Sequence, residues 1–326
     1  MSKDERPSIE DALKKVRKQY GESAVMYDDS LPESVDTVPT GSYALDYVMG
    51  NGLPRGRIIE LFGHESSGKS TMCSFIISQI QKRGGQCAYI DAEQAFDAEY
   101  ATKIGVDTKK LYLAQTGTLE ECMDIVRAFI STNQIDLIVI DSVAALTPKA
   151  EAEAEEMLKP TMGLQARLIG TSMRILSPMI GKSKTTVIFI NQMREKIGAW
   201  GNPETTPGGK ALKYFASIRL QVKKKEIFEG KNKERIGNEI EITAVKNKVA
   251  PPFRKRTVNL YYGSGIDLNA DLFDEAVERG VISKSGNTYT YHGEKIGVGR
   301  EDSLGGFAAY DSAIVRKEVD EVYAKK

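Results

Sequence analysis

The feature that most constrains this chain is the segment GHESSGKS at residues 63–70. It matches the pattern G-x-x-x-x-G-K-[ST], in which glycine-rich backbone wraps around the phosphates of a nucleotide. A β-type run at residues 57–62 precedes it, and residues 71–83 can form one helix. The alternative is a chance match on a glycine-containing turn. The strand, loop and helix in this order predict an ATP-binding site.

Each residue type in the loop has a place in this chemistry. Lys69 would reach the terminal phosphates, the Ser70 hydroxyl would ligate Mg²⁺, and the helix N-terminus would add partial positive charge. The residues expected to contact the nucleotide here are Gly63, Glu65, Ser66, Ser67, Gly68, Lys69, Ser70 and Thr71.

Composition limits the class of protein. With 326 residues, 41% of them hydrophobic, the chain can bury a large core and is expected to hold one main domain with appendages. Acidic and basic residues balance at 45 each, so a nucleic-acid site would have to be local. The isolated Cys73, Cys87 and Cys122 suit reduced thiols, and no segment resembles a signal peptide or membrane span. We therefore expect a cytoplasmic protein without a metal cluster.

By pattern the chain divides into an N-terminal arm with its linker at residues 1–33, a core at residues 34–265 and a small C-terminal domain at residues 266–326. In the arm, Ser8 can cap a helix that runs to Tyr20, and residues 24–27 are strand-like. One helix and one strand cannot bury their own apolar face. The arm is therefore expected to dock on its own core or, by strand addition, on a neighbouring subunit.

In the core, short apolar runs alternate with helical stretches, which is typical of an α/β fold with a mostly parallel sheet covered on both faces. The clearest strands are residues 86–90, 137–140 and 187–190, and polar groups follow each of them. Ligands bind at such carboxyl ends. Residues 218–222 and 240–242 predict antiparallel strands added to the same sheet. The lysine-rich segment between them is either a solvated hairpin tip or a DNA contact.

Hydrolysis of ATP requires one carboxylate to help hold Mg²⁺ and another to orient and deprotonate the attacking water. Asp141, which ends the LIVID strand, suits the first role, and Glu93 suits the second. Neighbouring parallel strands would deliver both groups to the same end of the sheet. The alternatives are a helix cap for Asp141 and a surface carboxylate for Glu93.

Six segments extend the pattern nearly end to end: GLPRGRIIELFGHESSGKST (52–71), YIDAEQAFDAEYATKIGVD (89–107), DLIVIDSVAALTPKAE (136–151), FINQMREKIG (189–198), GNPETTPGGKALK (201–213) and AVKNKVAPPF (244–253). With these segments the chain resembles the RecA family of bacterial DNA strand-exchange recombinases. GNPETT followed by GG, and the KNK element, are specific to this family among proteins that share the phosphate loop. The resemblance implies a RecA-type P-loop ATPase core, a polymerisation arm and a small α+β C-terminal domain.

The resemblance also implies roles for single residues. Glu93 would be the catalytic base acting with Lys69, and Gln192 would sense the γ-phosphate and signal to the loop that follows it. Further nucleotide contacts would be Asp97, Tyr100, Asp141, Lys246, Lys248, Tyr262 and Gly263. Of these, the two lysines would reach across a filament interface to the neighbour's ATP, and Tyr262 with Gly263 would lie across the interface beside the adenine.

Two loops, residues 156–163 and 193–210, would bind single-stranded DNA. The expected contacts are Met162, Gly163, Arg167, Arg174, Arg194, Lys196, Trp200, Gly208 and Gly209. Basic side chains would neutralise phosphates, and glycines would let backbone N–H groups approach them closely. Trp200, the only tryptophan of the chain, is expected at the DNA surface rather than in the core.

The sequence thus predicts a DNA-dependent ATPase that uses ATP and Mg²⁺, forms helical filaments on single-stranded DNA, pairs it with homologous double-stranded DNA and exchanges strands. Other copies of the chain would be partners, with a LexA-like repressor and mediator proteins as further candidates. One alternative is a hexameric motor or an ATP-regulated clock-type protein on the same core fold, and another is a non-hydrolysing DNA-coating protein. The arm and the GNPETTPGG segment favour the recombinase, and intact Lys69, Glu93 and Asp141 argue against a non-hydrolysing protein.

Overall fold

The structure is a computed structural model that describes residues 8–25, 35–154, 163–195, 204–229 and 234–324. The chain forms two compact units, Met1–Val35 and Asp36–Lys326. Within the first unit, α1 (Ile9–Tyr20) begins as the sequence predicts, since Ser8 Oγ accepts a hydrogen bond from the Asp11 amide and donates one to its carboxylate. No residue of α1 is buried.

The strand expected at residues 24–27 is wrong at its start. Ala24 ends a 3-10 helix, η1 (Glu22–Ala24), and Val25 lies in a bend. The Arg17 guanidinium donates to the Val25 carbonyl at 3.0 Å, which folds this segment back toward α1. Residues 26 and 27 lie outside the described part of the chain.

The helices of the second unit are α2 (Tyr43–Met49), α3 (Lys69–Lys82), α4 (Ala98–Ile104), α5 (Leu119–Ser131), α6 (Lys149–Ala152), α7 (Leu164–Ser183), α8 (Ala211–Phe215), α9 (Leu268–Glu278), α10 (Arg300–Phe307) and α11 (Ser312–Ala324), with 3-10 turns η3 (Thr108–Lys110) and η4 (Val143–Ala145). Its central sheet contains β3 (Ile58–Gly63), β4 (Cys87–Asp91), β5 (Leu111–Gln115), β6 (Leu137–Asp141), β7 (Thr186–Gln192), β10 (Ile218–Glu229), β11 (Arg235–Asn247), β12 (Lys255–Tyr261) and β13 (Gly265–Ile266). The short pairs are β1 (Thr37–Val38) with β2 (Leu53–Pro54) and β8 (Arg194–Glu195) with β9 (Glu204–Thr205).

The strands of the central sheet follow the order β13-β12-β11-β10-β3-β7-β6-β4-β5. From β10 to β5 neighbouring strands are parallel, and from β10 to β13 they are antiparallel. The predicted mostly parallel sheet is confirmed. The strand at residues 218–222 is antiparallel only to β11; it runs parallel to β3, because the long connection from β7 through α8 brings the chain back to the same end of the sheet.

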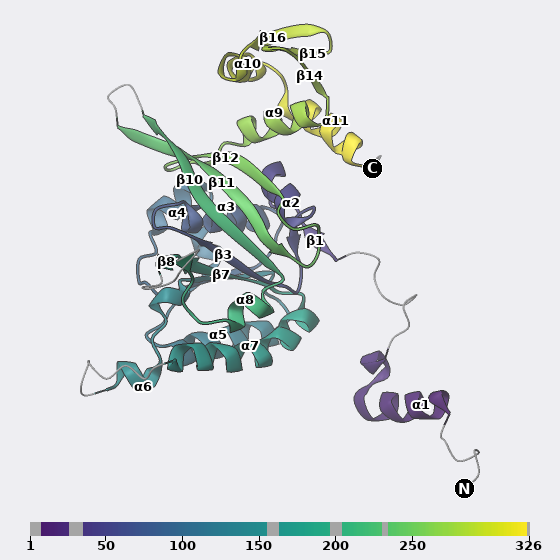
Figure 1. Ribbon diagram of the computed structural model, residues 1–326, viewed down its shortest axis with the longest axis vertical. Helices are drawn as coiled ribbons and strands as arrows, with labels where there is room; N and C mark the ends of the chain where they lie inside the picture. Colours follow the sequence, from purple (N-terminus) through teal and green to yellow (C-terminus); the bar gives the residue numbers. More distant parts are fainter. Residues whose placement is uncertain (1–7, 26–34, 155–162, 196–203, 230–233, 325–326) are drawn as a thin grey trace. The chain divides into compact units, whose positions relative to one another are not determined.

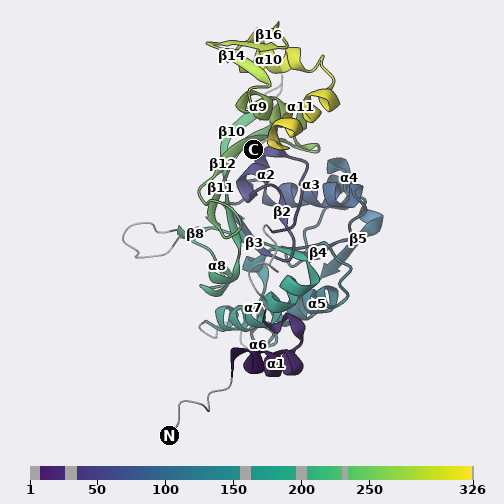
Figure 2. The ribbon, with the colours of Figure 1, turned by 90° about the vertical axis from the view of Figure 1, so that its right-hand side faces the viewer.

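Two hydrophobic layers cover the sheet. Strand side chains such as Ile59 and Leu61 pack with α2, α3 and α4 on one face, while Ile58 and Phe189 pack with α5, α7 and α8 on the other. Figures 1 and 2 show α3 and α4 on the opposite side of the sheet from α5 and α7. Because these strands are parallel, the carboxyl ends of β3, β4, β6 and β7 lie at the same end of the sheet, which is called the carboxyl edge below.

The C-terminal part has its own sheet of β14 (Ile282–Ser285), β15 (Thr288–Tyr291) and β16 (Glu294–Val298), packed with α9, α10 and α11 around Phe273 and Phe307. Its cluster also includes Tyr43 from α2. The Asp271 carboxylate accepts from the amides of Tyr43 at 2.7 Å and Ala44 at 3.0 Å, so α9 caps the beginning of α2.

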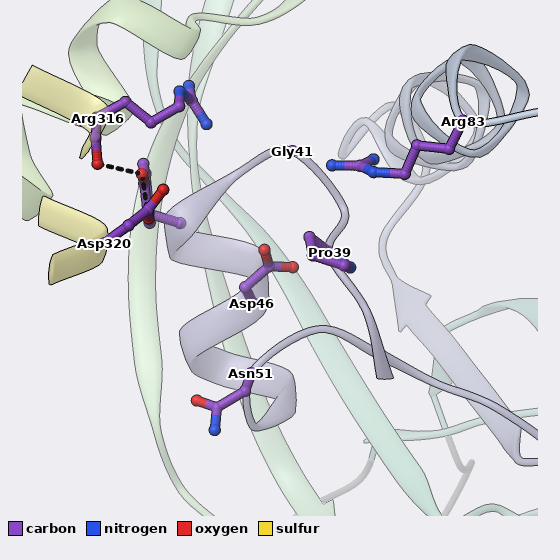
Figure 3. A pocket seen from close by; sticks show the side chains of 8 residues that line it. Pro39, Gly41, Asp46, Asn51, Arg83, Arg316 and Asp320 are labelled. Carbon is purple, nitrogen blue, oxygen red and sulfur yellow. Dashed lines mark hydrogen bonds between the residues drawn. The ribbon is translucent and has the colours of Figure 1, made fainter. Parts of the chain in front are cut away.

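A hollow of about 300 Å³ lies beside this junction. Figure 3 shows Arg316 and Asp320 of α11 on one side of it, Arg83 at the end of α3 on the other, and Asp46 of α2 between them. Burial raises the pKa of Asp46 to about 6, although Thr40 donates two hydrogen bonds to its carboxylate.

Candidate functional site

The phosphate loop leaves the end of β3 and enters α3, as the sequence predicts. Gly63 has no room for a side chain, because a Cβ there would lie 2.2 Å from the Val222 carbonyl oxygen. Gly68 has φ +89° and Ser66 has φ +55°, which curl the backbone into a concave turn. Amide groups of such a turn face inward and suit a bound phosphate.

Lys69 is buried within this turn. Its ammonium donates to the carbonyls of His64 at 2.7 Å and Gly63 at 3.2 Å. Burial lowers the pKa of Lys69, and the nearby carboxylates of Asp141 and Glu93 oppose that shift. The Lys69 ammonium therefore bonds to carbonyl groups of its own loop. Phosphate oxygens of a bound nucleotide could replace these carbonyl groups as its partners.

Asp141 lies at the end of β6, next to the first turn of α3. Its Oδ2 accepts hydrogen bonds of 2.6 Å from both the Ser70 hydroxyl and the Tyr89 hydroxyl. Burial raises the pKa of Asp141, and these two hydrogen bonds oppose the increase. Ser70 and Asp141 thus form the hydroxyl and carboxylate pair that fits a Mg²⁺ ion beside a triphosphate.

Glu93 follows β4 and points toward the ends of β6 and β7. Its Oε1 accepts from the buried Ser142 hydroxyl and, at 3.1 Å, from the Gln192 amide. The catalytic candidates predicted on three different strands therefore meet at one edge of the sheet. Sequence reasoning missed the hydroxyl groups of Tyr89 and Ser142 as partners of the two carboxylates. Tyr89 lies in the strand that ends at Asp91, and Ser142 directly follows Asp141, so their positions in the sequence could have indicated these contacts.

A cavity of about 150 Å³ extends from this cluster toward α4. Tyr100 lies beside the phosphate-loop helix, since its hydroxyl is 3.2 Å from Thr71 Oγ1. Asp97 caps α4 by accepting from the Tyr100 amide at 2.9 Å, so one carboxylate oxygen already has a structural partner. Both residues line the cavity with Ser70, Glu93 and Asp141.

Tyr262 and Gly263 follow β12. A Cβ at Gly263 would lie 4.0 Å from Lys103 Cδ in α4, and Gly263 has φ +80°. Tyr262 is half exposed, and its hydroxyl accepts from the Asn238 amide at 2.9 Å. Gly263 therefore lies beside the α4 of its own chain, whereas the resemblance implied a position across the interface.

Lys246 and Lys248 are not brought to the phosphate loop of their own chain. Asn247 pairs with Ile218, which pairs with Ile59, whereas Gly63 pairs with Val222. Four residues along a strand correspond to about 13 Å. The two ammonium groups instead donate to the Tyr214 carbonyl at the end of α8, at 2.9 and 3.2 Å.

The described DNA candidates lie around the start of α7 and the segments next to β8 and β9. Gly163 precedes α7 with φ +76°, and Arg167, Arg174 and Arg194 are exposed. Three other candidates, Met162, Lys196 and Trp200, lie outside the described residues.

Gly208 and Gly209 have a packing reason for being glycine. A Cβ at Gly208 would lie 3.0 Å from Ile169 and Val143, and one at Gly209 would lie 2.7 Å from Ala166 Cβ. Both also have positive φ, at +84° and +74°. These glycines let the backbone lie directly on α7, a role that is separate from contact with DNA.

Among the described residues, no helix combines the length and the apolar character needed to cross a bilayer.

Residues 7–267 match the model of the RecA N-terminal domain, and residues 270–305 match that of the RecA C-terminal domain. The chain is 50% identical over 307 residues to Protein RecA of Lactobacillus delbrueckii subsp. bulgaricus, covering 93% of this chain and 92% of that protein. It is 48% identical over 305 residues to Protein RecA of Staphylococcus aureus, covering 93% and 87%.

Among solved structures, the crystal structure of the RadB recombinase is similar with a TM-score of 0.55. The match covers 71% of this chain and 98% of that one at 18% identity, so it supports the fold alone.

Proposed function

Because the chain belongs to the RecA family of DNA strand-exchange recombinases, we propose that it is a DNA-dependent ATPase with its nucleotide site at the carboxyl edge of β3, β4, β6 and β7. The observation that carries this proposal is the convergence of Lys69, the Ser70–Asp141 pair and the Glu93–Gln192 pair on that edge. The protein would polymerise on single-stranded DNA, pair that strand with a homologous duplex and exchange strands.

In this proposal the phosphate loop holds the triphosphate through its backbone amides, and Lys69 leaves its carbonyl partners to contact the terminal phosphates. Ser70 and Asp141 would hold Mg²⁺, and the ion would supply positive charge beside the phosphates. Glu93 orients the attacking water and takes its proton. Gln192 turns from Glu93 toward the γ-phosphate, which frees the base when ATP is in place.

The adenine end of the nucleotide would lie along α4. Asp97 and Tyr100 line the cavity that leads there, and Tyr100 offers a ring for stacking. We assign Tyr262 and Gly263 to the same chain's site, since Gly263 lies next to Lys103 of α4.

Lys246 and Lys248 would complete the site of a neighbouring subunit, because their position at the other end of the sheet separates them from their own phosphate loop. ATP would then lie between subunits. Nucleotide binding and filament geometry would become one coupled equilibrium.

The surface around β5 and α5 suits the N-terminal arm of another copy. β5 is an edge strand, and its Tyr112 and Leu113 are 49% and 46% exposed. A groove of about 680 Å³ on α5 is lined by Glu120, Glu121 and Asp124 together with apolar Ile125. The helix α1 carries a matching set of basic residues: Lys14, Lys15, Arg17 and Lys18. Complementary charge and an open strand edge suit the docking of α1 here, and we propose that the arm comes from another copy.

DNA would run past the start of α7 and the two loops. Arg167, Arg174 and Arg194 are exposed on these segments and could neutralise phosphates despite the zero net charge of the chain. We also infer a cytoplasmic location, which the buried, unpaired Cys73, Cys87 and Cys122 support.

The test combines two measurements. ATP hydrolysis with Mg²⁺ should rise strongly when single-stranded DNA is added, and a circular single strand should exchange with a homologous linear duplex only when ATP is present. Negative-stain images with a non-hydrolysable ATP analogue should show helical filaments. An equal rate of hydrolysis with and without DNA, or closed rings in place of filaments, would contradict the proposal and favour a motor-type protein.

A further inference from the structure

A charged group is buried inside the central sheet. Glu60 lies on β3 between apolar Ile59 and Leu61, and its side chain has 0% exposure. A buried carboxylate is costly unless it is paired and hydrogen-bonded. Glu60 is paired: its Oε2 lies 2.5 Å from Arg219 Nε on β10, and the guanidinium stacks over the Phe62 ring at 4.5 Å.

The other oxygen of Glu60 holds Asn191 on β7, the strand on its other side. Asn191 is also fully buried, and its Nδ2 donates to Glu60 Oε1 at 3.0 Å. Three neighbouring strands thus contribute one side chain each to a buried network: Arg219, Glu60 and Asn191. An apolar set of the same size would fill this space without the desolvation cost, so the network calls for a reason other than packing.

The remaining hydrogen bonds of Asn191 suggest that reason. Its Nδ2 also donates to the Pro207 carbonyl at 3.1 Å, and its Oδ1 accepts from the Gln192 amide at 3.0 Å. Both donors and the acceptor of the carboxamide are therefore used. One side chain ties the backbone of Gln192 to the residue that directly precedes Gly208 and Gly209.

We propose that Asn191, oriented by the buried Glu60–Arg219 pair, is a positioning residue that couples Gln192 to Gly208 and Gly209. The inference rests on the proposed function, in which Gln192 contacts the γ-phosphate and DNA runs past the segment that contains the two glycines. A movement of the Gln192 backbone shifts the side-chain carboxamide of Asn191, and this shift in turn moves the Pro207 carbonyl. The same link transmits a displacement in the other direction, because coupling between two binding sites is reciprocal.

The packing of Gly208 and Gly209 makes such a link effective. Gly208 has Ile169 and Val143 at 3.0 Å from its Cβ position, and Gly209 has Ala166 at 2.7 Å. The segment after Pro207 is therefore supported on α7 and cannot absorb a shift by moving toward that helix. A displacement at Pro207 passes to the two glycines.

The experiment uses the full chain with Asn191→Ala and the matched variant Thr186→Val. Thr186 lies at the opposite end of the same strand, is equally buried, and donates one hydrogen bond of 2.8 Å to the Pro54 carbonyl. Affinity for a fluorescent single-stranded oligonucleotide is measured with a non-hydrolysable ATP analogue and with ADP. The ratio of the two dissociation constants reports the coupling.

In wild type and Thr186→Val this ratio should be large, and in Asn191→Ala it should fall by about tenfold. ATP affinity without DNA is measured as well, so that a loss of coupling is separated from a loss of nucleotide binding. If Asn191→Ala does not fold, Asn191→Ser replaces it; its hydroxyl is too short to span from Glu60 to Pro207, so the same loss is expected.

A wild-type ratio in the Asn191 variant, or an equal loss in Thr186→Val, would overturn this inference while leaving the proposed function intact. A wild-type protein without any nucleotide-dependent affinity for DNA would instead contradict the proposed function itself. The two failures are therefore distinguishable.

Discussion

Glu93 Oε1 accepts two hydrogen bonds, one from Ser142 and one from Gln192. Gln192 thereby occupies the oxygen of Glu93 that would have to face an attacking water. A site built this way holds its base in a less reactive state until Gln192 finds another acceptor. The γ-phosphate of ATP would supply that acceptor in the proposed function.

Replacing Glu93 with Gln should lower DNA-stimulated ATP hydrolysis by about 10²–10⁴-fold, because the general base is lost while the shape of the side chain is kept. Binding of a fluorescent ATP analogue should remain, since Lys69 and the loop backbone are unchanged. Glu99→Gln, which changes an exposed carboxylate on α4, is the control. Near-normal hydrolysis in Glu93→Gln would remove Glu93 from the catalytic role.

Tyr89→Phe tests the hydroxyl that the sequence did not reveal. The Tyr89 hydrogen bond opposes the burial that raises the pKa of Asp141, so its loss should let Asp141 keep a proton to higher pH. Protons compete with Mg²⁺ for the carboxylate. The Mg²⁺ concentration for half-maximal hydrolysis should rise by about tenfold, and more at lower pH. Tyr291→Phe, in the C-terminal sheet, should leave it unchanged.

The sequence predicted Lys69, Ser70, Asp141, Glu93 and Gln192 together, and the structure brings them to one edge. Asp141 and Gln192 end strands, Glu93 follows one, and Lys69 and Ser70 lie in the phosphate loop, so their order in the sequence fixes their positions. The role of Gln192 came from the resemblance to the RecA family. Tyr89 and Ser142 depend on side-chain direction. Such directions follow from packing across strands that are distant in sequence, which local patterns do not contain.

At the scale of whole elements, the strand order decides which residues can share a site. Apolar alternation predicted β10 and β11 as an antiparallel pair, but could not predict that β10 runs parallel to β3. That pairing places the end of β11, with Lys246 and Lys248, away from the phosphate loop. The separation of these lysines from their own phosphate loop follows from the strand pairing, which local sequence patterns do not contain.

Mixing two inactive variants tests the shared site. The double variant Lys246→Ala/Lys248→Ala should be inactive alone but should keep its phosphate loop and Glu93. Glu93→Gln keeps both lysines. In mixtures, some interfaces would combine one intact loop with intact lysines, and DNA-stimulated hydrolysis should partly recover.

The recovery should depend on the mixing ratio and reach its maximum near equal amounts. Co-assembly of the two variants must be shown by co-sedimentation with DNA. Absence of recovery at every ratio, with co-assembly present, would count against lysines that act in trans.

The N-terminal arm is expected to be needed for assembly and not for folding. Deleting residues 1–33 should leave a folded core, because the second unit is compact by itself and has its own hydrophobic clusters. The truncated protein should bind ATP but remain monomeric and form no filaments, as measured by light scattering and electron microscopy. Filaments of normal length would show that the arm is not required for assembly.

At the scale of the whole second unit, the C-terminal part is joined to the ATPase core by a buried carboxylate. Asp271 caps α2, and burial raises its pKa to about 7, more than its hydrogen bonds from Ala44, Ser42 and Tyr43 lower it. Asp46, close by, adds negative charge and raises it further. The junction is therefore held by a group that titrates near neutral pH.

The raised pKa of Asp271 determines how the stability of the folded chain should change with pH. A carboxyl group whose pKa is about 7 when folded and about 4 when unfolded stabilises the folded chain most below pH 4, and that contribution is lost as the pH rises toward 7. Asp271→Asn cannot ionise, so the stability of wild type relative to this variant should decline between pH 4 and 7 and level off above it. Urea unfolding at a series of pH values measures the difference. Thr186→Val, an uncharged change elsewhere in the unit, should show no such trend, and a difference that instead grows with pH would mean that the hydrogen bonds to Asp271 outweigh its burial.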